Sequence, residues 1–442
     1  MFNSINFTSF KKGNLVIQDL PVIKLIPIIK HFLLGSKIAT STLSLQAARM
    51  TSHIMPTYNR LPVTFDRGEG AWLFDDKNNR YLDALSGIAV CNLGHAHPAI
   101  HNAICEQSKK LIHTSNIYGI PGQELLAEKL TEKSGMDNVF FCNSGAEANE
   151  AAIKLARKFG HEKGLDNPAI IVMEKSFHGR TLATLSATGN SKVQYGFTPL
   201  VEGFIRVPYN NIESIKTALA QNNNIVAILV EPIQGEGGVN IPAPDYINQL
   251  RQLCDQYDLL LMLDEIQTGI GRTGKFLAFQ HNDIIPDVCT LAKALGNGVP
   301  IGACLARGKA AKLLTAGTHG STFGGNPLAC SAALAVLATL DEKNLINSAT
   351  QKGALIRLGL TELLKTNSHV VDIRNKGLMI GIELDRPCAE LVHLALQQRL
   401  LINVTNETTI RLLPPLIIDE LQIKLLVETL SGIINDYTEH TA

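Results

Sequence analysis

The order of hydrophobic and polar positions predicts apolar strands that alternate with amphipathic helices through the middle of the chain. The strand candidates are five short apolar runs at residues 138–142, 169–173, 225–232, 259–265 and 287–292. Continuous apolar runs of this length are typical of strands that are covered on both faces of a sheet. Residues 147–159 carry apolar side chains at helical spacing, and a second helix is expected to begin at Pro244. We therefore expect an α/β fold built on a mostly parallel, doubly wound sheet.

Three charged residues stand at or just past the ends of the predicted strands, namely Glu231, Asp264 and Lys293. In doubly wound sheets, ligands bind at the carboxyl ends of the parallel strands. We therefore expect these three side chains to converge on one crevice.

Lys293 is the only charged residue between residues 290 and 302, and glycines follow it closely. Burial lowers the pKa of an amine and makes the amine nucleophilic, so this lysine is a candidate for chemistry. A solvated surface lysine is the alternative interpretation.

The segments on either side of this central region have a different pattern. Residues 370–384 alternate between apolar and polar positions as a hairpin does, and residues 55–90 are rich in strand-forming side chains. We expect residues 51–110 and 336–442 to form a smaller α+β domain together. Residues 111–335 then form the large domain.

Residues 1–50 differ in composition from the rest of the chain, because they contain six Lys or Arg and a single acid, Asp19. Their apolar part is interrupted by two lysines and a proline, so we expect no membrane span, and no secretory cleavage pattern stands out. Two interpretations remain open, an organelle transit peptide or a start of the protein at Met50 or Met55. We favour the later start and treat residues 1–50 as an N-terminal extension outside the fold.

Composition excludes several classes of partner. The chain has 442 residues, 45% of them hydrophobic, and its 40 basic and 40 acidic residues give a formal net charge of zero. No basic stripe alternates with aromatic residues, so we expect no nucleic-acid partner. None of the eight cysteines forms a C-x-x-C pair, which argues against a zinc or other metal site and for reduced thiols. We expect a cytoplasmic protein, or one of the mitochondrial matrix if residues 1–50 are a transit peptide.

Two glycine-containing stretches are candidate anion sites. Ser144, Gly145 and Ala146 stand between a predicted strand and a predicted helix, where free backbone N–H groups bind anions; an ordinary helix cap at Ser144 is the alternative. Residues 269–274 spell G-x-G-x-x-G, a possible dinucleotide fingerprint. The segment after it is too short for the crossover helix that such a site needs, so we discount a nicotinamide-dependent dehydrogenase. Asp264, just before it, is instead a candidate partner for a protonated ring nitrogen, or a buried acid paired elsewhere.

Six motifs together resemble the class III (ornithine-type) pyridoxal-phosphate aminotransferases. They are, in order, NSGAEANEAAIKLARKF, FHGRT, VEPIQGEGGV, LDEIQTGIGRTG, LAKALGNGVPIGA and THGSTFGGNPLA. The resemblance runs from about Met55 to the end of the chain. It implies a fold-type I transferase fold, pyridoxal 5'-phosphate as cofactor, a homodimer, and amino acids and 2-oxo acids as substrates.

The resemblance also implies roles for individual residues around the cofactor. Lys293 would form the Schiff base with the cofactor aldehyde and shuttle a proton, and Asp264 would pair with the pyridinium nitrogen. Gln267 would bind the phenolic oxygen, and Phe177 would stack on the ring. The phosphate would be held by Ser144, Gly145 and Ala146, together with Thr322 of the partner subunit.

Four further residues would bind the substrates. Arg180 would hold a carboxylate through its planar guanidinium, with Ser321 beside it. Arg411 matches a second carboxylate-binding arginine, and Glu236 matches the acid that masks it. An acid that pairs with Arg411 in one half-reaction and swings away in the other would let one pocket accept both glutamate and an uncharged acyl arm.

Within the family, two motifs favour one branch. FHGR, with His178, and GTHGSTFGGNP favour the enzymes of arginine biosynthesis that act on N-acetylornithine and 2-oxoglutarate. Enzymes for succinylornithine, N-succinyl-diaminopimelate or ornithine remain alternatives, as does a non-catalytic cofactor-binding protein. The lysine motif departs from the family pattern at Asn297, where glycine is common, and Ile266 is a milder variant.

Overall fold

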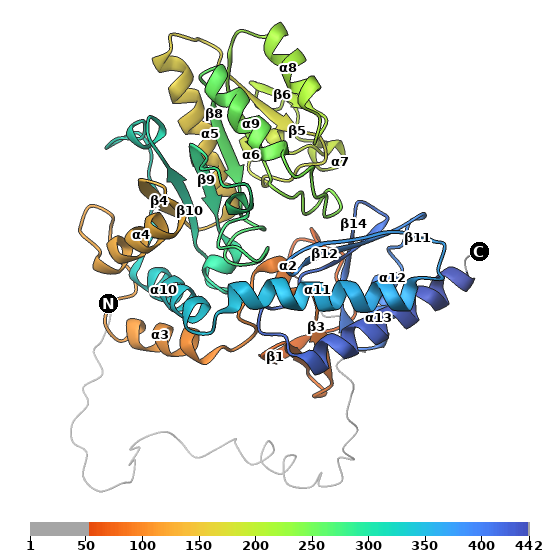
Figure 1. Ribbon diagram of the computed structural model, residues 1–442. Coiled ribbons are helices and arrows are strands. Elements are labelled where there is room, and N and C mark those ends of the chain that lie inside the picture. Colours follow the sequence, from red (N-terminus) through yellow and green to blue (C-terminus); the bar gives the residue numbers. More distant parts are fainter. Residues whose placement is uncertain (1–52, 441–442) are drawn as a thin grey trace, which may run out of the picture. The chain divides into compact units, whose positions relative to one another are not determined.

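The computed structural model describes residues 53–440, which fall into two units. Residues 53–60 belong to the first unit and contain no helix or strand. Residues 61–440 belong to the second unit and contain the helices and strands labelled in Figure 1. The N-terminal extension predicted at residues 1–50 lies outside the described residues. Within the described range, no helix is long and apolar enough to cross a membrane.

A seven-stranded sheet forms the core of the second unit, with the strand order β4-β10-β9-β8-β7-β5-β6. In that order the strands are β4 (Asn138–Cys142), β10 (Gly302–Ala306), β9 (Val288–Leu291), β8 (Leu260–Asp264), β7 (Ile225–Val230), β5 (Ala169–Met173) and β6 (Phe204–Val207). β10 is antiparallel to both of its neighbours, and the remaining pairs are parallel. The expected mostly parallel sheet is confirmed with all five expected strands, and β6 and β10 are additions that the pattern does not predict.

Helices pack on both faces of this sheet because its strands are apolar on both sides. The connections contain α5 (Gly145–Glu162), α6 (Leu182–Ala187), α7 (Ser191–Gln194), α8 (Ile212–Gln221), α9 (Tyr246–Gln256) and the short 3-10 turns η1 (Ala278–His281), η2 (Lys293–Leu295) and η3 (Ala310–Lys312). Ile170 and Val172 of β5 pack with α5, whereas the residues next to them belong to the apolar cluster that contains α9. α9 begins at Tyr246 rather than at Pro244, with Asp245 as its N-cap.

Two four-stranded sheets are built from the segments on either side of the central region. One consists of β1 (Phe65–Glu69), β2 (Trp72–Asp75), β3 (Arg80–Asp83) and β13 (Leu400–Leu401). The other consists of β11 (Val370–Lys376), β12 (Met379–Leu384), β15 (Thr409–Leu412) and β14 (Asn403–Thr405). β11 and β12 confirm the expected hairpin, and β13 pairs in parallel with β3, so N-terminal and C-terminal segments share one sheet.

The remaining helices accompany these two sheets and the edge of the central sheet. They are α2 (Ser86–Ala89), α3 (Pro98–Ser108), α4 (Pro121–Ser134), α10 (Pro327–Glu342), α11 (Leu345–Leu364), α12 (Leu391–Gln397) and α13 (Glu420–His440). The domain boundaries at residues 51–110, 111–335 and 336–442 remain a prediction.

The short element α2 is a left-handed turn, because all four of its residues have φ angles between 51° and 65°. Each residue other than glycine adopts this conformation at a cost of roughly 1–2 kcal/mol. Asp83 holds the start of the turn, since its Oδ1 accepts hydrogen bonds from the N–H groups of Leu85 at 2.9 Å and Ser86 at 2.8 Å. Nε2 of His95 lies 2.7 Å from the other carboxylate oxygen. The turn is therefore fixed by groups outside it.

Candidate active site

A cavity of about 390 Å³ lies at the carboxyl ends of the central strands. Glu231, Asp264 and Lys293 line it together, as the strand pattern predicts. The other lining residues that the resemblance singles out are Ser144, Gly145, Ala146, Phe177, Arg180, Glu236 and Gln267. Arg411 lies behind this wall and contacts Glu236 and Gln267, whereas Ser321 and Thr322 line a different cavity.

Lys293 is the first residue of η2, and only Ala292 separates it from β9. Its φ angle of 45° lies in the left-handed region, which is unusual for a lysine. Burial lowers the pKa of its amine from 10.5 to about 8, although the nearby charge of Glu236 acts in the opposite direction. These properties favour a reactive amine over a solvated surface lysine.

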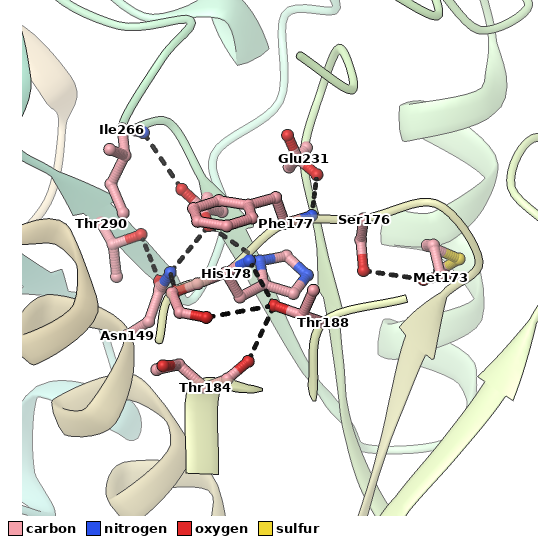
Figure 2. A network of polar contacts seen from close by, with 12 residues as sticks. Asn149, Met173, Ser176, Phe177, His178, Thr184, Thr188, Glu231, Ile266 and Thr290 are labelled. Carbon is pink, nitrogen blue, oxygen red and sulfur yellow. Dashed lines mark hydrogen bonds and ion pairs between the residues drawn. The ribbon is translucent and has the colours of Figure 1, made fainter. Parts of the chain in front are cut away.

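Asp264, the last residue of β8, is held by a network of polar contacts. Figure 2 shows Asn149, His178, Ile266 and Thr290 of this network from close by. Its Oδ2 accepts a hydrogen bond from Nδ2 of Asn149 at 2.7 Å and lies 2.8 Å from Nδ1 of His178. Its Oδ1 accepts from the N–H of Ile266 at 3.1 Å. Asn149 is itself fixed, because its Oδ1 accepts from the hydroxyl of Thr290 at 2.8 Å. The carboxylate therefore lines the cavity in one orientation.

His178 and Asn149 are site residues that the sequence patterns do not reveal. In the sequence, His178 is only a marker of the family branch, and Asn149 lies inside a helical motif. The side chain of His178 is fully buried, and its Nε2 has no hydrogen-bond partner in the described part of the chain. The two residues stand 86 and 115 positions from Asp264, so neither spacing nor periodicity indicates the contact.

The amino end of α5 borders the cavity through Ser144, Gly145 and Ala146. Ser144 is the N-cap, and its hydroxyl accepts a hydrogen bond from the N–H of Glu147 at 3.2 Å. The helix-cap interpretation and the anion-site interpretation are thus compatible, because the residues that start the helix also line the cavity. The N–H groups of a first helical turn lack intrahelical partners, and the helix dipole favours an anion there.

Arg411, on β15, is fully buried and its guanidinium is only partly satisfied. Its Nη1 donates to Glu236 at 2.7 Å and to Gln267 at 3.2 Å, and its Nε donates to Asn403 at 3.2 Å. Its Nη2 is buried and has no hydrogen-bond partner among residues 53–440. The side chain of Glu236 is 36% exposed. Burial raises the pKa of Glu236, but the charge and hydrogen bond of Arg411 outweigh burial and hold this pKa below its ordinary value.

Glu231 supports the wall of the cavity through two hydrogen bonds to the backbone. Its Oε1 accepts from the N–H of Phe177 at 2.9 Å, and its Oε2 accepts from the N–H of Gly235 at 3.1 Å. Burial raises the pKa of Glu231 to about 7. The guanidinium of Arg180 lies 5.7 Å from the centre of the Phe177 ring. Glu231 thus fixes both Phe177 and the start of the loop that carries Glu236.

Ser321 and Thr322 lie on a loop outside the cavity of Lys293. Ser321 accepts a hydrogen bond from Nδ2 of Asn143 at 3.2 Å, and its carbonyl accepts from Nδ2 of Asn116 at 3.0 Å. The two segments that meet here expose the apolar side chains of Leu111, Ile112, Ile117, Tyr118 and Phe323. Within one chain, Thr322 lines a different cavity together with Asn143 and Glu147, and it does not line the cavity that contains Lys293.

The G-x-G-x-x-G stretch at residues 269–274 packs against other parts of the chain. A Cβ atom at Gly274 would lie 2.1 Å from Oγ1 of Thr350, and one at Gly271 would lie 3.2 Å from the side chain of Ile346. Only the short turn η1 follows the stretch, where a dinucleotide site needs a crossover helix. The glycines therefore serve close packing on α11, and the dehydrogenase interpretation has no structural support.

Asn297, the departure from the family pattern, has a φ angle of 46°, a region that asparagine tolerates better than most residues. Its Oδ1 accepts a hydrogen bond from the N–H of Leu93 at 2.8 Å, and its Nδ2 donates to the carbonyl of Gly94 at 3.1 Å. The side chain thus joins the loop after Lys293 to the segment after the left-handed turn. Val90 of that segment lines the cavity.

Similarity to known proteins identifies the family. The family described as aminotransferase class-III matches residues 54–434. The chain belongs to the class-III aminotransferases. This assignment agrees with the order of the six motifs, and class-III aminotransferases use pyridoxal 5'-phosphate.

Individual class-III aminotransferases are similar over most of their length. The acetylornithine aminotransferase of Nitrosomonas europaea is 57% identical over 388 residues, which cover 88% of this chain and 99% of that protein. The crystal structure of the acetylornithine aminotransferase from Elizabethkingia anophelis matches with a TM-score of 0.78 at 38% identity, over 87% of this chain and 96% of that one. The structure of an ornithine aminotransferase from Toxoplasma gondii has partial occupancy of pyridoxal 5'-phosphate at its active site. It matches with a TM-score of 0.84 at 34% identity, over 88% of this chain and 93% of that one.

Proposed function

We propose that this class-III aminotransferase transfers the amino group of N-acetylornithine to 2-oxoglutarate, a step of arginine biosynthesis. The products are N-acetylglutamate 5-semialdehyde and glutamate. The observation that carries the proposal is the pair of Arg411 and Glu236 at the wall of the cavity that contains Lys293. The names of the similar acetylornithine aminotransferases support the same substrate. Succinylornithine, N-succinyl-diaminopimelate and ornithine are the alternative amino donors.

Three chemical features of the cavity fit pyridoxal 5'-phosphate. The amino end of α5 suits its phosphate, the fixed carboxylate of Asp264 suits its protonated ring nitrogen, and the amine of Lys293 suits its aldehyde. Gln267 and Phe177 also line the cavity and would contact the phenolic oxygen and the ring face. When bound, this group would supply an electron-accepting ring that stabilises negative charge at the substrate carbon that carries the amino group.

Lys293 is the residue that we expect to move the proton at the carbon that carries the transferred amino group, which is Cδ of N-acetylornithine and Cα of glutamate. A pKa of about 8 leaves a sizeable fraction of the amine neutral near that pH, as a general base requires. Arg180 would bind, through its planar fork of N–H donors, the carboxylate that both substrates carry away from the reacting carbon. Glu231 keeps Phe177 in place through the backbone N–H of that residue. The residues of this chain thus orient the substrate and carry its proton.

A switch at Arg411 accommodates two substrates that differ at the carbon that carries the transferred amino group. In glutamate this carbon also carries the α-carboxylate, whereas in N-acetylornithine it is a CH2 group, and the carboxylate and the acetylated amine stand at the far end. A buried guanidinium without a carboxylate partner is costly, so Arg411 keeps Glu236 while the acyl substrate is bound. When glutamate is bound, its α-carboxylate replaces Glu236, whose side chain is 36% exposed and can turn outward. The unpartnered Nη2 of Arg411 offers that carboxylate a further donor.

The active unit in this proposal is a homodimer, with Thr322 of the partner subunit at the phosphate. Thr322 does not line the Lys293 cavity of its own chain, and apolar side chains are exposed beside it, as is typical of an interaction surface. Mixing inactive Lys293→Ala chains with weakened Thr322→Ala chains tests this arrangement. A mixed dimer carries both defects in one site and none in the other, so we expect activity to recover. A fully active monomer at high dilution would contradict the shared site.

The location in this proposal is the cytoplasm, because all eight cysteines lie in the described part of the chain and are free thiols. The mitochondrial matrix is the alternative, and it depends on residues 1–50. Fractionation of cells that express the chain with and without these residues distinguishes the two.

A panel of amino donors, with 2-oxoglutarate as the acceptor, tests the reaction. The panel contains N-acetylornithine, N-succinylornithine, N-succinyl-diaminopimelate, ornithine and 4-aminobutyrate. We expect the highest kcat/KM with N-acetylornithine and no activity in the Lys293→Ala control. A higher kcat/KM with another donor would reassign the substrate. A preparation that binds NAD and does not transaminate would contradict the reaction itself.

A further inference from the structure

The acid of the proposed switch, Glu236, stands on the loop of residues 234–240 between β7 and α9, which we call the Glu236 loop. The two ends of this loop are joined by backbone hydrogen bonds between Gln234 and Asn240, at 3.2 and 3.0 Å. Nδ2 of Asn240 also donates to Oε1 of Gln234 at 3.0 Å. Because the loop is closed on itself, the position of Glu236 depends on what holds the loop from outside.

One row of side chains across β11, β12 and β15 packs against the Glu236 loop. Arg374 of β11 and Arg411 of β15 are both directly opposite Gly381 of β12. Directly opposed residues of antiparallel strands point to the same face, so the two arginines flank one glycine on that face. A Cβ atom at Gly381 would lie 3.0 Å from Cβ of Val239, so the glycine allows the loop to approach closely.

The two arginines hold different parts of the loop. Arg411 binds the side chain of Glu236, at 2.7 Å. Arg374 binds the backbone, because its Nη2 donates to the carbonyl of Gly238 at 2.6 Å and its Nε donates to the carbonyl of Val239 at 2.9 Å. The sheet therefore fixes the backbone after Glu236 and, through a separate arginine, the carboxylate of Glu236.

The charge of Arg374 is balanced away from the cavity of Lys293. Its Nη1 donates to Asp372 at 2.9 Å and to Glu383 at 2.7 Å. Arg374 lines a second cavity, of about 460 Å³, and not the one that contains Lys293. Arg374 therefore has no contact with a substrate in the Lys293 cavity, and any effect on the reaction passes through the loop. Thr405 adds an anchor, since its hydroxyl donates to the carbonyl of Glu236.

We propose that Arg374 is a positioning residue of the substrate switch, an inference that rests on the proposed function of Glu236. Its hydrogen bonds fix the backbone of the Glu236 loop, so that only the side chain of Glu236 moves between the two half-reactions. Without the hydrogen bonds of Arg374, the Glu236 loop can adopt more conformations. Glu236 then forms its ion pair with Arg411 in a smaller fraction of them. The acylornithine half-reaction then slows. The rate of the glutamate half-reaction does not change, because Glu236 is turned away from Arg411 in that half-reaction.

Arg374→Met tests this in the holoenzyme through single-turnover rates with N-acetylornithine and with glutamate. We expect the ratio of the two rates to fall about tenfold, through a slower acylornithine half-reaction alone. In a Glu236→Ala background, the same substitution should leave the ratio unchanged, because Arg374 acts through Glu236. Arg357→Met is the matched control, since Arg357 donates to the β11 carbonyl of Ile373 at 3.2 Å and has no hydrogen bond to the loop within the described residues.

Hydrogen exchange gives a readout that does not depend on activity. The amides of residues 234–240 should exchange faster in Arg374→Met than in the wild type or in Arg357→Met. If Arg374→Met does not fold, Arg374→Lys carries the test, because lysine keeps the charge and lacks the planar fork that reaches both carbonyls.

Two results overturn the proposal. One is an unchanged rate ratio in a folded Arg374 variant, and the other is a ratio that shifts equally when Glu236 is absent. Failure of the proposed function has a different signature, because the wild-type enzyme would then not react with N-acetylornithine.

Discussion

The two sides of the cavity hold a buried charge in opposite ways. On one side, both oxygens of Asp264 are engaged, by two side chains and a backbone N–H. On the other side, one guanidinium nitrogen of Arg411 has no partner among the described residues, and the balancing acid Glu236 is 36% exposed. The first charge is locked in place, and the second can exchange its partner. In the proposed function, the cavity thus combines a fixed side for the cofactor with an adjustable side for the substrate.

Burial explains why this difference matters. Removing one partner of a buried charge pair costs about 3–5 kcal/mol, because the remaining charge is left uncompensated. Asp264 keeps the same partners throughout the proposed reaction, so a saturated network only adds rigidity. Arg411 must accept either an acid of its own chain or one of the substrate. Because its Nη2 has no partner in the described part of the chain, Arg411 can exchange one carboxylate for the other with little change in free energy.

The largest expected effect comes from Lys293→Ala, which removes the reactive amine that lies in the cavity with both Asp264 and Glu236. The rate should fall by more than the roughly 10²–10⁴-fold that proton transfer alone contributes, because the covalent attachment point is lost as well. The measurement is kcat with N-acetylornithine and 2-oxoglutarate at saturating cofactor. Turnover within about tenfold of the wild type would remove Lys293 from the mechanism.

A selective effect is expected on the adjustable side from Glu236→Ala. This variant leaves Arg411 without a carboxylate when the acyl substrate is bound, and it leaves the glutamate half-reaction unaffected or improved. Loss of a charged hydrogen bond is worth about 1.5–3 kcal/mol, so the relative specificity should shift by roughly ten- to a hundredfold. Single-turnover rates for each half-reaction measure the shift. Equal losses in both would mean that Glu236 is a fixed structural acid.

The smallest of the three effects is expected on the fixed side, from His178→Leu. The variant removes one contact of Asp264 and leaves Asn149 in place. We expect the affinity for pyridoxal 5'-phosphate to fall about tenfold, the lower end of what a charged hydrogen bond contributes. His178→Asn is the matched control, because its side-chain amide retains an N–H donor. Equilibrium dialysis gives the dissociation constants, and equal values for both variants and the wild type would show that His178 only fills space.

The hydrophobic pattern predicts the central strands because they are buried on both faces and read as continuous apolar runs. It misses β6 because this four-residue edge strand contains the exposed Arg206. It misses β10 because the sequence GACLA consists mainly of small residues, and their burial comes from the apolar clusters on the two faces of the sheet, which on one face include α5. A strand whose burial is supplied by its neighbours leaves only a weak signal in its own sequence.

The convergence of Glu231, Asp264 and Lys293 follows from strand order alone, since parallel strands end at the same edge of a sheet. The contact of His178 with Asp264 does not follow, because it joins distant segments that only tertiary packing brings together. The same holds for Arg374 and the Glu236 loop. The role of Thr322 at the phosphate site of a second chain stays a prediction.

The left-handed turn at residues 86–89 cannot form by itself, because three of its four residues carry side chains that disfavour positive φ angles. The segment after it is held by late parts of the chain, since Asn297 binds Leu93 and Gly94, and the N–H of Leu416 donates to the carbonyl of Asn92 at 2.7 Å. During folding, the turn can therefore close only after these segments have arrived. We therefore expect the cavity that Val90 lines to be completed late in folding and to be lost early in unfolding. On gradual heating, activity should disappear while the far-ultraviolet circular dichroism of the central sheet and its helices is still intact.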